Sequence, residues 1–167
     1  GTRVRLVAPR GAAPSAPASD AVRGTTAGPA ASDRREAAAG ALRILVVDDH
    51  KTMRAALREV LHERPELSVI GEAADGLEAI TSARALRPDV ILMDASMPHM
   101  DGFEATARIH AELPHIEILG LSMQARSEAG PVFEQAGAAG FFAKGTDMQR
   151  LVDHLLHLRQ LRRVLPT

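Results

Sequence analysis

The sequence contains no cysteine, which excludes disulfide bonds, thiolate metal sites and a cysteine nucleophile and fits a reducing cytosol. It also lacks any apolar run near the roughly 20 residues that a membrane-spanning helix requires, because Asp, Arg or Pro interrupts each aliphatic stretch. These two absences predict a cytoplasmic location and no membrane contact by this part of the chain.

Neither sign of charge dominates. Lys and Arg number 20, Asp and Glu number 21, and the formal net charge is −1. Domains that bind nucleic acid usually carry a basic face, which this balance does not supply. We therefore expect no nucleic-acid binding by this domain.

The first 40 residues differ in composition from the rest. Ala, Gly, Pro, Ser and Thr fill 23 of the 30 positions from 11 to 40, and such a segment buries too little apolar surface to offset the entropy of ordering. Residues 11–40 are therefore predicted to form a flexible, disordered linker. In residues 1–10, apolar and charged side chains alternate as they do in a strand. A strand without a partner is not stable alone, which favours a remnant of another domain. The first residue, Gly1, suits either a chain cut from a longer polypeptide or a processed end.

From Leu42 onward, short aliphatic runs alternate with helical patterns. This alternation predicts βαβ units around a parallel sheet in a domain at 41–163, with 164–167 as a tail. The five runs read RILVV, LSVIGEA, VILM, IEILGL and AGFFA.

Helix boundaries are marked by capping pairs and by prolines. The predicted helix starts are Asp75 with Glu78, Asp101 with Glu104 and Thr146 with Gln149. The fourth helix, near residues 128–136, contains Gly130 and Pro131 and is predicted to be short, burying little besides Val132 and Phe133.

Chemically active side chains follow four of the five runs. The first run ends in Asp48 and Asp49, the third in Asp94, the fourth in Ser122 and the fifth in Lys144. In an open parallel sheet, ligands bind outside the carboxyl ends of the strands. Each residue alone has an ordinary reading, such as a helix cap or a solvated lysine. In register on successive strands they predict one shared site.

Three carboxylates at one edge repel one another, so they either hold protons or recruit a cation. With neither Cys nor His ending these strands, all-oxygen ligation favours Mg²⁺. A carboxylate can also accept a phosphoryl group when a metal and a lysine offset the incoming negative charge. The histidines are scattered, and none is a candidate phosphodonor. His99, in the loop after Asp94, is interpreted as a solvated residue.

Four segments resemble the receiver domain of response regulators in bacterial two-component signalling: RILVVDDH, DVILMDASMPHMDGFEA, ILGLSM and GAAGFFAKGTDMQRLV. The resemblance covers about Leu42 to Arg163 and is greatest to the branch that often precedes a DNA-binding helix-turn-helix. It implies a doubly wound, flavodoxin-like α/β fold, with a five-stranded parallel sheet in the order 2-1-3-4-5 and helices on both faces. The periodicity alone predicts only the βα alternation.

The resemblance also implies a role for each candidate residue. Asp94 would be phosphorylated. Asp49, Asp94 and the backbone carbonyl of Ser96 would bind Mg²⁺ directly, and Asp48 would act mainly through water. Lys144 would hold phosphoryl oxygens.

A switch is implied by the same resemblance. Ser122 would also hold a phosphoryl oxygen and would move toward it, after which Phe141 would turn inward. The altered surface would comprise the fourth helix, the fifth strand and the last helix. Phe141 lacks the hydroxyl of the tyrosine often found at this position, and Gly145 follows Lys144 where many receivers have proline.

The function implied is a phosphoacceptor signalling domain whose partner is a histidine kinase or phosphotransfer domain. It would assist its own phosphorylation and dephosphorylation without being an enzyme in isolation. An interaction-only pseudo-receiver is an alternative that the complete acidic pocket disfavours. A hydrolase of the haloacid-dehalogenase kind is disfavoured because its Asp-x-Asp pattern does not match Asp48-Asp49-His50.

Residues 1–10 are similar to the closing strand of the ATP-binding domain in sensor histidine kinases. With the linker, this similarity favours a receiver fused to the C-terminus of a hybrid kinase. The alternative is a transcriptional response regulator whose DNA-binding domain has been removed. The sequence makes no prediction of the oligomeric state.

Overall fold

A computed structural model describes residues 40–164, apart from the side chain of Arg126. The predicted remnant strand at 1–10, the predicted linker up to residue 39 and residues 165–167 lie outside the described residues. Within the described range, one sheet has five parallel strands in the order β2-β1-β3-β4-β5, as the resemblance implied. The strands are β1 (Leu42–Val47), β2 (Leu67–Ala73), β3 (Val90–Asp94), β4 (Glu117–Ser122) and β5 (Gly140–Ala143).

The strands are short aliphatic runs because a parallel sheet covered by helices is buried on both faces. All of β3 is buried, and so is all of β4 except its first residue. Each predicted run forms a strand, with ends that differ from the prediction by no more than about one residue.

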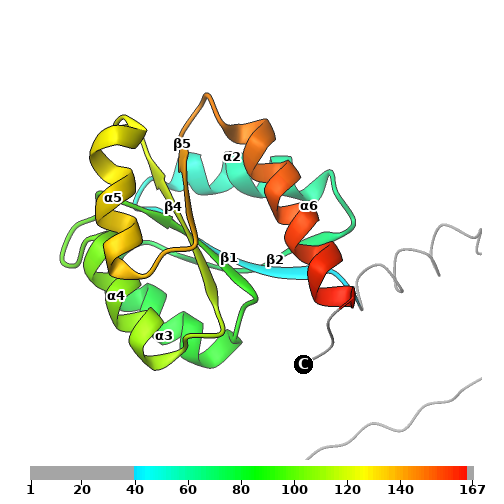
Figure 1. Ribbon diagram of the computed structural model, residues 1–167, viewed down its shortest axis with the longest axis horizontal. Coiled ribbons are helices and arrows are strands. Elements are labelled where there is room, and N and C mark those ends of the chain that lie inside the picture. The colour runs from blue at the N-terminus through cyan, green and yellow to red at the C-terminus, as the bar shows by residue number, and fades with distance from the viewer. Residues whose placement is uncertain (1–39, 165–167) are drawn as a thin grey trace, which may run out of the picture.

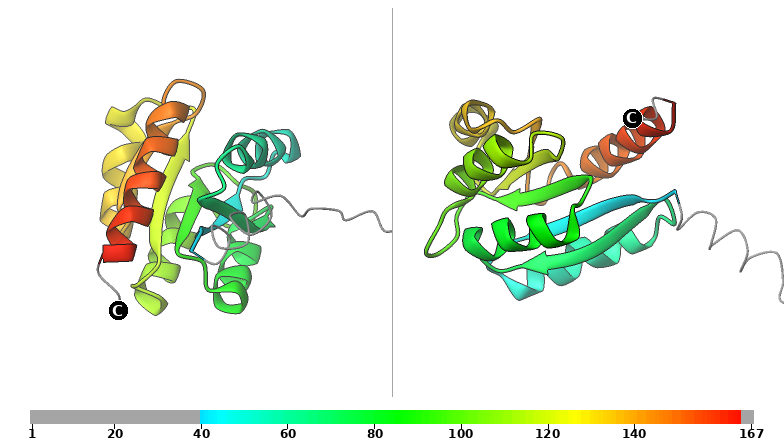
Figure 2. Two further views of the ribbon diagram at one scale, coloured as in Figure 1. Left: turned by 90° about the vertical axis from the view of Figure 1, so that its right-hand side faces the viewer. Right: turned by 90° about the horizontal axis from the view of Figure 1, so that it is seen from below.

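Helices cover both faces of this sheet (Figures 1 and 2). They are α2 (Lys51–His62), α3 (Gly76–Leu86), α4 (Gly102–Glu112), α5 (Arg126–Ala136) and α6 (Met148–Val164). One core lies between the sheet and α3, α4 and α5, and the other between the sheet and α2 and α6. None of the helices in the described range is both long and apolar enough to cross a membrane.

Two of the three predicted capping pairs are confirmed. Oδ1 of Asp75 accepts a hydrogen bond from the amide of Glu78 over 2.8 Å, and Oδ1 of Asp101 accepts one from the amide of Glu104 over 2.8 Å. Each bond satisfies an amide that the first helical turn would otherwise leave unpaired. These caps fix where α3 and α4 begin.

The third predicted capping pair is wrong. The last helix begins at Met148, so Asp147 and not Thr146 precedes its first residue. The carboxylate of Asp147 turns back to accept a hydrogen bond from the amide of Ala143 over 3.1 Å. This bond closes the turn between β5 and α6 and displaces the helix start by one residue.

The predicted weak helix, α5, is anchored by one aromatic side chain. Phe133 is fully buried over Gly120 of β4, where a Cβ atom would lie 2.4 Å from the Phe133 ring. Its ring centroid lies 4.6 Å from that of Phe103 and 6.1 Å from that of Phe141. The prediction that Val132 is also buried is wrong, since Val132 is 43% exposed. Neighbouring residues on a helix point in different directions, so Phe133 packs in the core with Ala129, one turn earlier, and Val132 does not.

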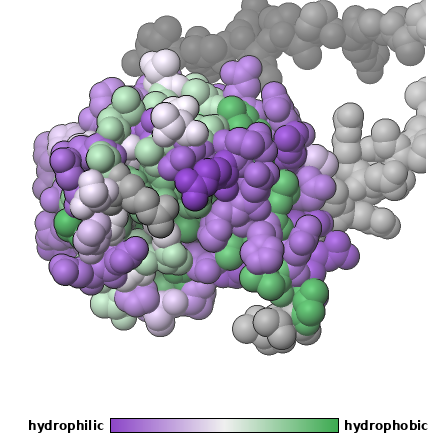
Figure 3. Space-filling view, turned by 45° about the horizontal axis from the view of Figure 1, so that its top comes forward, coloured by the Kyte–Doolittle hydropathy of each residue, from purple (hydrophilic) through white to green (hydrophobic). Residues whose placement is uncertain are grey.

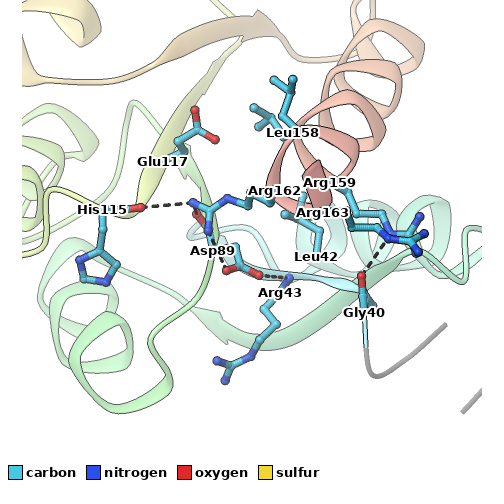
Figure 4. Close-up of a pocket in the computed structure, with 12 residues that line it drawn as sticks. Gly40, Leu42, Arg43, Asp89, His115, Glu117, Leu158, Arg159, Arg162 and Arg163 are labelled. Carbon is cyan, nitrogen blue, oxygen red and sulfur yellow. Dashed lines mark hydrogen bonds and ion pairs between the residues drawn. The ribbon is translucent and has the colours of Figure 1, made fainter. Parts of the chain in front are cut away.

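A hollow of about 820 Å³ lies at the amino ends of the strands, next to the end of α6 (Figure 4). Arg162 donates to Oδ1 of Asp89 over 2.9 Å and to the backbone carbonyl of His115 over 3.2 Å. Arg159 donates to the carbonyl of Gly40 over 3.1 Å. These bonds hold the end of α6 against the sheet, at the edge opposite the predicted site.

Candidate functional site

The predicted site residues lie at the carboxyl ends of four strands. Asp48 directly follows β1, Asp94 ends β3, Ser122 ends β4, and Lys144 directly follows β5. Because the strands are parallel, these ends share one edge of the sheet. The edge lies at the top of Figure 1, beside the loop from β5 to α6. Figure 3 turns it toward the reader and shows a largely hydrophilic surface.

The ammonium group of Lys144 links two of the carboxylates. Its Nζ atom donates to Oδ2 of Asp48 over 2.5 Å and lies 2.8 Å from Oδ1 of Asp94. The Asp48 side chain is fully buried, and those of Asp94 and Lys144 are each 6% exposed. One cation between two buried carboxylates leaves a net negative charge at this edge, to which Asp49 adds another.

Burial raises the pKa of Asp94, because desolvation penalises the charged carboxylate. The hydrogen bond and charge of Lys144 lower this pKa without outweighing burial, and the charge of Asp48 raises it further. Burial alone would lower the pKa of Lys144, but hydrogen bonds and charges from both carboxylates hold it above its usual value. Lys144 is therefore charged at neutral pH.

Asp49 supplies the third carboxylate and an unsatisfied oxygen. Its Oδ1 atom is buried and accepts no hydrogen bond from the residues that the structure describes. Nδ1 of His50 lies 2.7 Å from this oxygen, but the pair lacks hydrogen-bond geometry. Single ligand atoms of Asp48, Asp49, His50 and Asp94 lie within 4.8 Å of one another. An orphaned carboxylate oxygen beside two further carboxylates fits a hard divalent cation such as Mg²⁺.

The chain after Asp94 returns closely over the end of β3. The amide of Gly102 donates to the carbonyl of Ala95 over 3.0 Å, and a Cβ atom on Gly102 would lie 1.8 Å from the carbonyl oxygen of Asp94. Only glycine can therefore begin α4 at this point. His99, in the intervening loop, is exposed and has a φ of 67°, a left-handed conformation that side chains seldom adopt.

The two predicted switch residues are both buried. Ser122 is 3% exposed, and its Oγ atom accepts a hydrogen bond from the amide of Gln124 over 3.0 Å. Phe141 is also 3% exposed and packs in the core with Phe133. The ring of Phe141 already points inward here, so a switch that uses Ser122 cannot begin with Phe141 outside the core.

Sequence reasoning missed three residues at this edge, which are His50, Arg54 and Glu72. His50 is grouped with the scattered histidines, although its position directly after two aspartates is an available signal. Arg54 donates to the backbone carbonyl of Asp48 over 2.7 Å and to Glu72 of β2 over 3.0 Å. The implied strand order already places β2 beside β1, but no sequence pattern signals that an arginine of α2 reaches Glu72.

Comparison with known proteins identifies the family of this domain. The profile of the response regulator receiver domain matches residues 44–156. The response regulator GacA of Pseudomonas viridiflava is 37% identical over 111 residues, which cover 66% of this chain and 52% of GacA. The response regulator UvrY of Escherichia coli O6:H1 is 38% identical over 111 residues, covering 66% of this chain and 51% of UvrY. The chain thus spans about half the length of the curated relatives it matches.

Solved structures show the same architecture. A two-component response regulator of the LuxR family from Aurantimonas sp. SI85-9A1 is 33% identical, with a TM-score of 0.68 over 72% of this chain and 86% of that chain. The signal receiver domain of the putative response regulator NarL from Mycobacterium tuberculosis is 31% identical, with a TM-score of 0.67 over 72% and 97% of the two chains.

Proposed function

Because the chain belongs to the response regulator receiver domain family, we propose that it is the phosphoacceptor of a two-component phosphorelay and takes a phosphoryl group onto Asp94. One observation carries this proposal. The carboxylate of Asp94 is held beside the ammonium of Lys144, at a sheet edge where two more carboxylates meet. A nucleophile, a cation that can offset phosphoryl charge and a candidate metal site therefore lie together.

In the proposed reaction, a carboxylate oxygen of Asp94 attacks the phosphorus of a phosphohistidine on a histidine kinase or phosphotransfer domain. The P–O bond forms as the P–N bond breaks, and the imidazole leaves with the bonding electrons and takes up a proton. Lys144, whose Nζ atom lies 2.8 Å from Oδ1 of Asp94, would donate to the transferred phosphoryl oxygens. Ser122 is proposed to donate its hydroxyl to another of these oxygens.

Mg²⁺ is the proposed cofactor. Asp49, Asp94 and the backbone carbonyl of Ser96 would hold it, with Asp48 acting mainly through water. The unsatisfied Oδ1 of Asp49 and the excess of negative charge support this assignment. The bound ion would supply positive charge to the phosphoryl oxygens.

The output of the domain is proposed to be a changed surface of α5, β5 and α6, in a cytoplasmic setting. The alternative, an interaction-only pseudo-receiver, needs no phosphorylation. Its weakness is that the acidic residues, Ser122 and Lys144 are all present at the expected edge. Labelling of the protein separates the two proposals.

The test is incubation with acetyl phosphate and Mg²⁺, followed by intact-mass analysis. We expect one phosphoryl group per chain and none on Asp94→Asn, because an amide is a poor nucleophile. Asp153→Asn, which changes an exposed carboxylate on α6, is the matched control and should be labelled like the parent. Chelation of the metal should suppress labelling. Undiminished labelling of Asp94→Asn would contradict the assignment, and an unlabelled parent would favour the pseudo-receiver.

The parent polypeptide is proposed to be a hybrid histidine kinase, on the similarity of residues 1–10 to the closing strand of a kinase ATP-binding domain. A response regulator parent is the alternative, and the relatives GacA and UvrY, both named response regulators, support it. Reading the gene on both sides of the segment encoding this chain decides between a kinase domain upstream and a DNA-binding domain downstream.

A further inference from the structure

Arg54 connects the acidic loop to two secondary-structure elements. It lies in the first turn of α2, and its Nη1 atom donates to the backbone carbonyl of Asp48 over 2.7 Å. Its Nε atom donates to Oε2 of Glu72 on β2 over 3.0 Å. The Arg54 side chain is only 15% exposed. The guanidinium therefore joins α2, the end of β1 and the neighbouring strand β2.

The carbonyl that Arg54 holds belongs to the peptide that joins Asp48 to Asp49. The other polar groups of Asp48 are fixed separately. Its amide donates to the carbonyl of Ala73 over 3.1 Å, and its carboxylate accepts from the amide of His50 and from Lys144. Because a peptide unit is planar, fixing its carbonyl fixes the direction in which the chain enters Asp49.

Asp49 depends on this backbone support more than the other two aspartates do. Asp48 and Asp94 both contact Lys144, whereas Oδ1 of Asp49 accepts no hydrogen bond from the described residues. The contact of Asp49 with His50 engages a side chain that is 73% exposed. The position of the Asp49 carboxylate is therefore set mainly by its backbone.

We propose that Arg54 is a positioning residue of the cation site. By holding the Asp48 carbonyl, it orients the peptide that carries Asp49 and so strengthens the binding of a divalent cation. Glu72 acts through Arg54 by fixing the guanidinium. Arginine suits this task because its planar group offers several donors in a fixed geometry, whereas one ammonium cannot reproduce both bonds in the same arrangement. The inference rests on the proposed function for the identity of the cation, Mg²⁺.

The effect on affinity distinguishes positioning from simple electrostatics. A positive charge near a cation site repels the cation, so removing the charge of Arg54 would by itself tighten Mg²⁺ binding. Losing the hydrogen bonds that orient a metal ligand weakens binding, typically by about 10-fold to 100-fold. The two effects have opposite signs, and the direction of the change identifies the dominant one.

Arg58 provides a matched control on the same helix. Its Nη1 atom donates to Oε1 of Glu72 over 3.1 Å, so it shares the carboxylate that Arg54 uses. Its side chain is 61% exposed. Arg58→Ala therefore removes a positive charge and a bond to Glu72 while leaving the bond between Arg54 and the Asp48 carbonyl in place.

The experiment is a Mg²⁺ titration of the whole chain, in which binding is measured from the changes in the backbone amide NMR shifts of residues 48–50 and 94–96. It compares the parent with Arg54→Ala, Arg54→Lys and Arg58→Ala, and thermal unfolding without Mg²⁺ confirms that each is folded. We expect roughly 10-fold weaker binding for Arg54→Ala, partial recovery for Arg54→Lys, and affinity at or above that of the parent for Arg58→Ala. Excess Mg²⁺ should restore acetyl phosphate labelling of Arg54→Ala.

The proposal is overturned if Arg54→Ala binds Mg²⁺ as tightly as the parent or more tightly, or if Arg58→Ala loses as much affinity. If Arg54→Ala does not fold, Arg54→Lys decides, and parental affinity in that variant overturns the proposal. A parent that binds Mg²⁺ normally but is not labelled contradicts the proposed phosphoacceptor function alone, and the variants still decide the role of Arg54. A parent that binds no Mg²⁺ contradicts both.

Discussion

Nζ of Lys144 lies 2.8 Å from Oδ1 of Asp94, and the same ammonium donates to Oδ2 of Asp48 over 2.5 Å. The three side chains form a buried cluster of one cation and two anions. Because one anion is in excess, removing an anion and removing the cation should change the stability of the metal-free protein in opposite directions.

We predict that Asp94→Asn stabilises the metal-free protein at neutral pH. The substitution removes a desolvated carboxylate and leaves Lys144 paired with Asp48, so no buried charge is left alone. The gain should be on the order of 1 kcal/mol, the lower end of the range seen when buried ion pairs are replaced by neutral side chains. The measurement is urea unfolding of the parent and the variant in EDTA.

The gain should depend on pH. The pKa of Asp94 is raised by burial, so the folded parent binds this proton more tightly than the unfolded chain. The parent therefore loses stability as the pH rises from about 3.9, the ordinary value for Asp, through the higher pKa of the folded state. The advantage of Asp94→Asn should be complete above that folded pKa and absent below about pH 3.9. A gain that stays constant across this range would contradict the explanation.

Lys144→Met should have the opposite effect. It leaves Asp48 and Asp94 facing each other without a cation, and removing one partner from a buried charge cluster typically costs about 3–5 kcal/mol. The pKa of Lys144 is raised, so its stabilisation is fully present below the ordinary lysine value of about 10.4 and is lost as the pH rises through the folded pKa. Lys51→Met, at an exposed position, is the matched control. Equal unfolding midpoints for the two variants at pH 7 would count against the cluster.

Local signals account for the parts of the fold that were predicted correctly. The aliphatic runs predict all five strands. A strand in a helix-covered parallel sheet is rich in aliphatic residues, and such a run can be recognised without knowing which strands lie beside it. Asp75 and Asp101 cap helices through bonds that span only three residues. Thr146 fails as a cap because Asp147 is held by Ala143 of β5, a contact that depends on the turn geometry.

The site residues likewise divide into those that sequence signals predict and those that depend on contacts in three dimensions. The positions of Asp48, Asp94, Ser122 and Lys144 at one edge follow from the parallel sheet, which the βα alternation predicts. The contacts of Arg54 could not be predicted, since the implied sheet order places β2 beside β1 but does not specify which side chain of α2 reaches Glu72. The burial of Phe141 before any phosphorylation likewise depends on packing in three dimensions.

Gly102→Ala should disturb the acceptor residue directly. A Cβ atom there would lie 1.8 Å from the backbone oxygen of Asp94, which cannot move without shifting the end of β3. We expect a loss of about 3 kcal/mol in unfolding free energy, at the upper end for overpacking, and reduced acetyl phosphate labelling. Gly140→Ala is the control, because its Cβ would meet only side-chain atoms, of Leu119 at 3.3 Å and of Phe142 at 3.8 Å. Similar urea midpoints and labelling for both variants would show that the backbone at Asp94 tolerates the shift.

The last prediction concerns how a phosphoryl group on Asp94 would reach the α5 surface. A serine hydroxyl has one hydrogen to donate and can still accept a bond. Ser122 can therefore donate to a phosphoryl oxygen while its Oγ atom keeps the bond from the amide of Gln124. Movement of Ser122 would then pull the chain that leads into α5. Because Phe141 is already buried, the response should begin at Gln124 and not with an inward turn of the ring.

Ser122→Ala should therefore keep the labelling of Asp94 and lose much of the conformational response. The measurement is the change in backbone NMR shifts of residues 124–143 when the phosphate mimic beryllofluoride is added with Mg²⁺. The matched control is Ser127→Ala, which removes an exposed hydroxyl in the first turn of α5 and should respond as the parent does. A full response of Ser122→Ala over these residues would mean that the bond between Ser122 and Gln124 does not carry the signal. Asp94 would remain the acceptor in that case, because its assignment depends on the carboxylate cluster and Lys144 and not on Ser122.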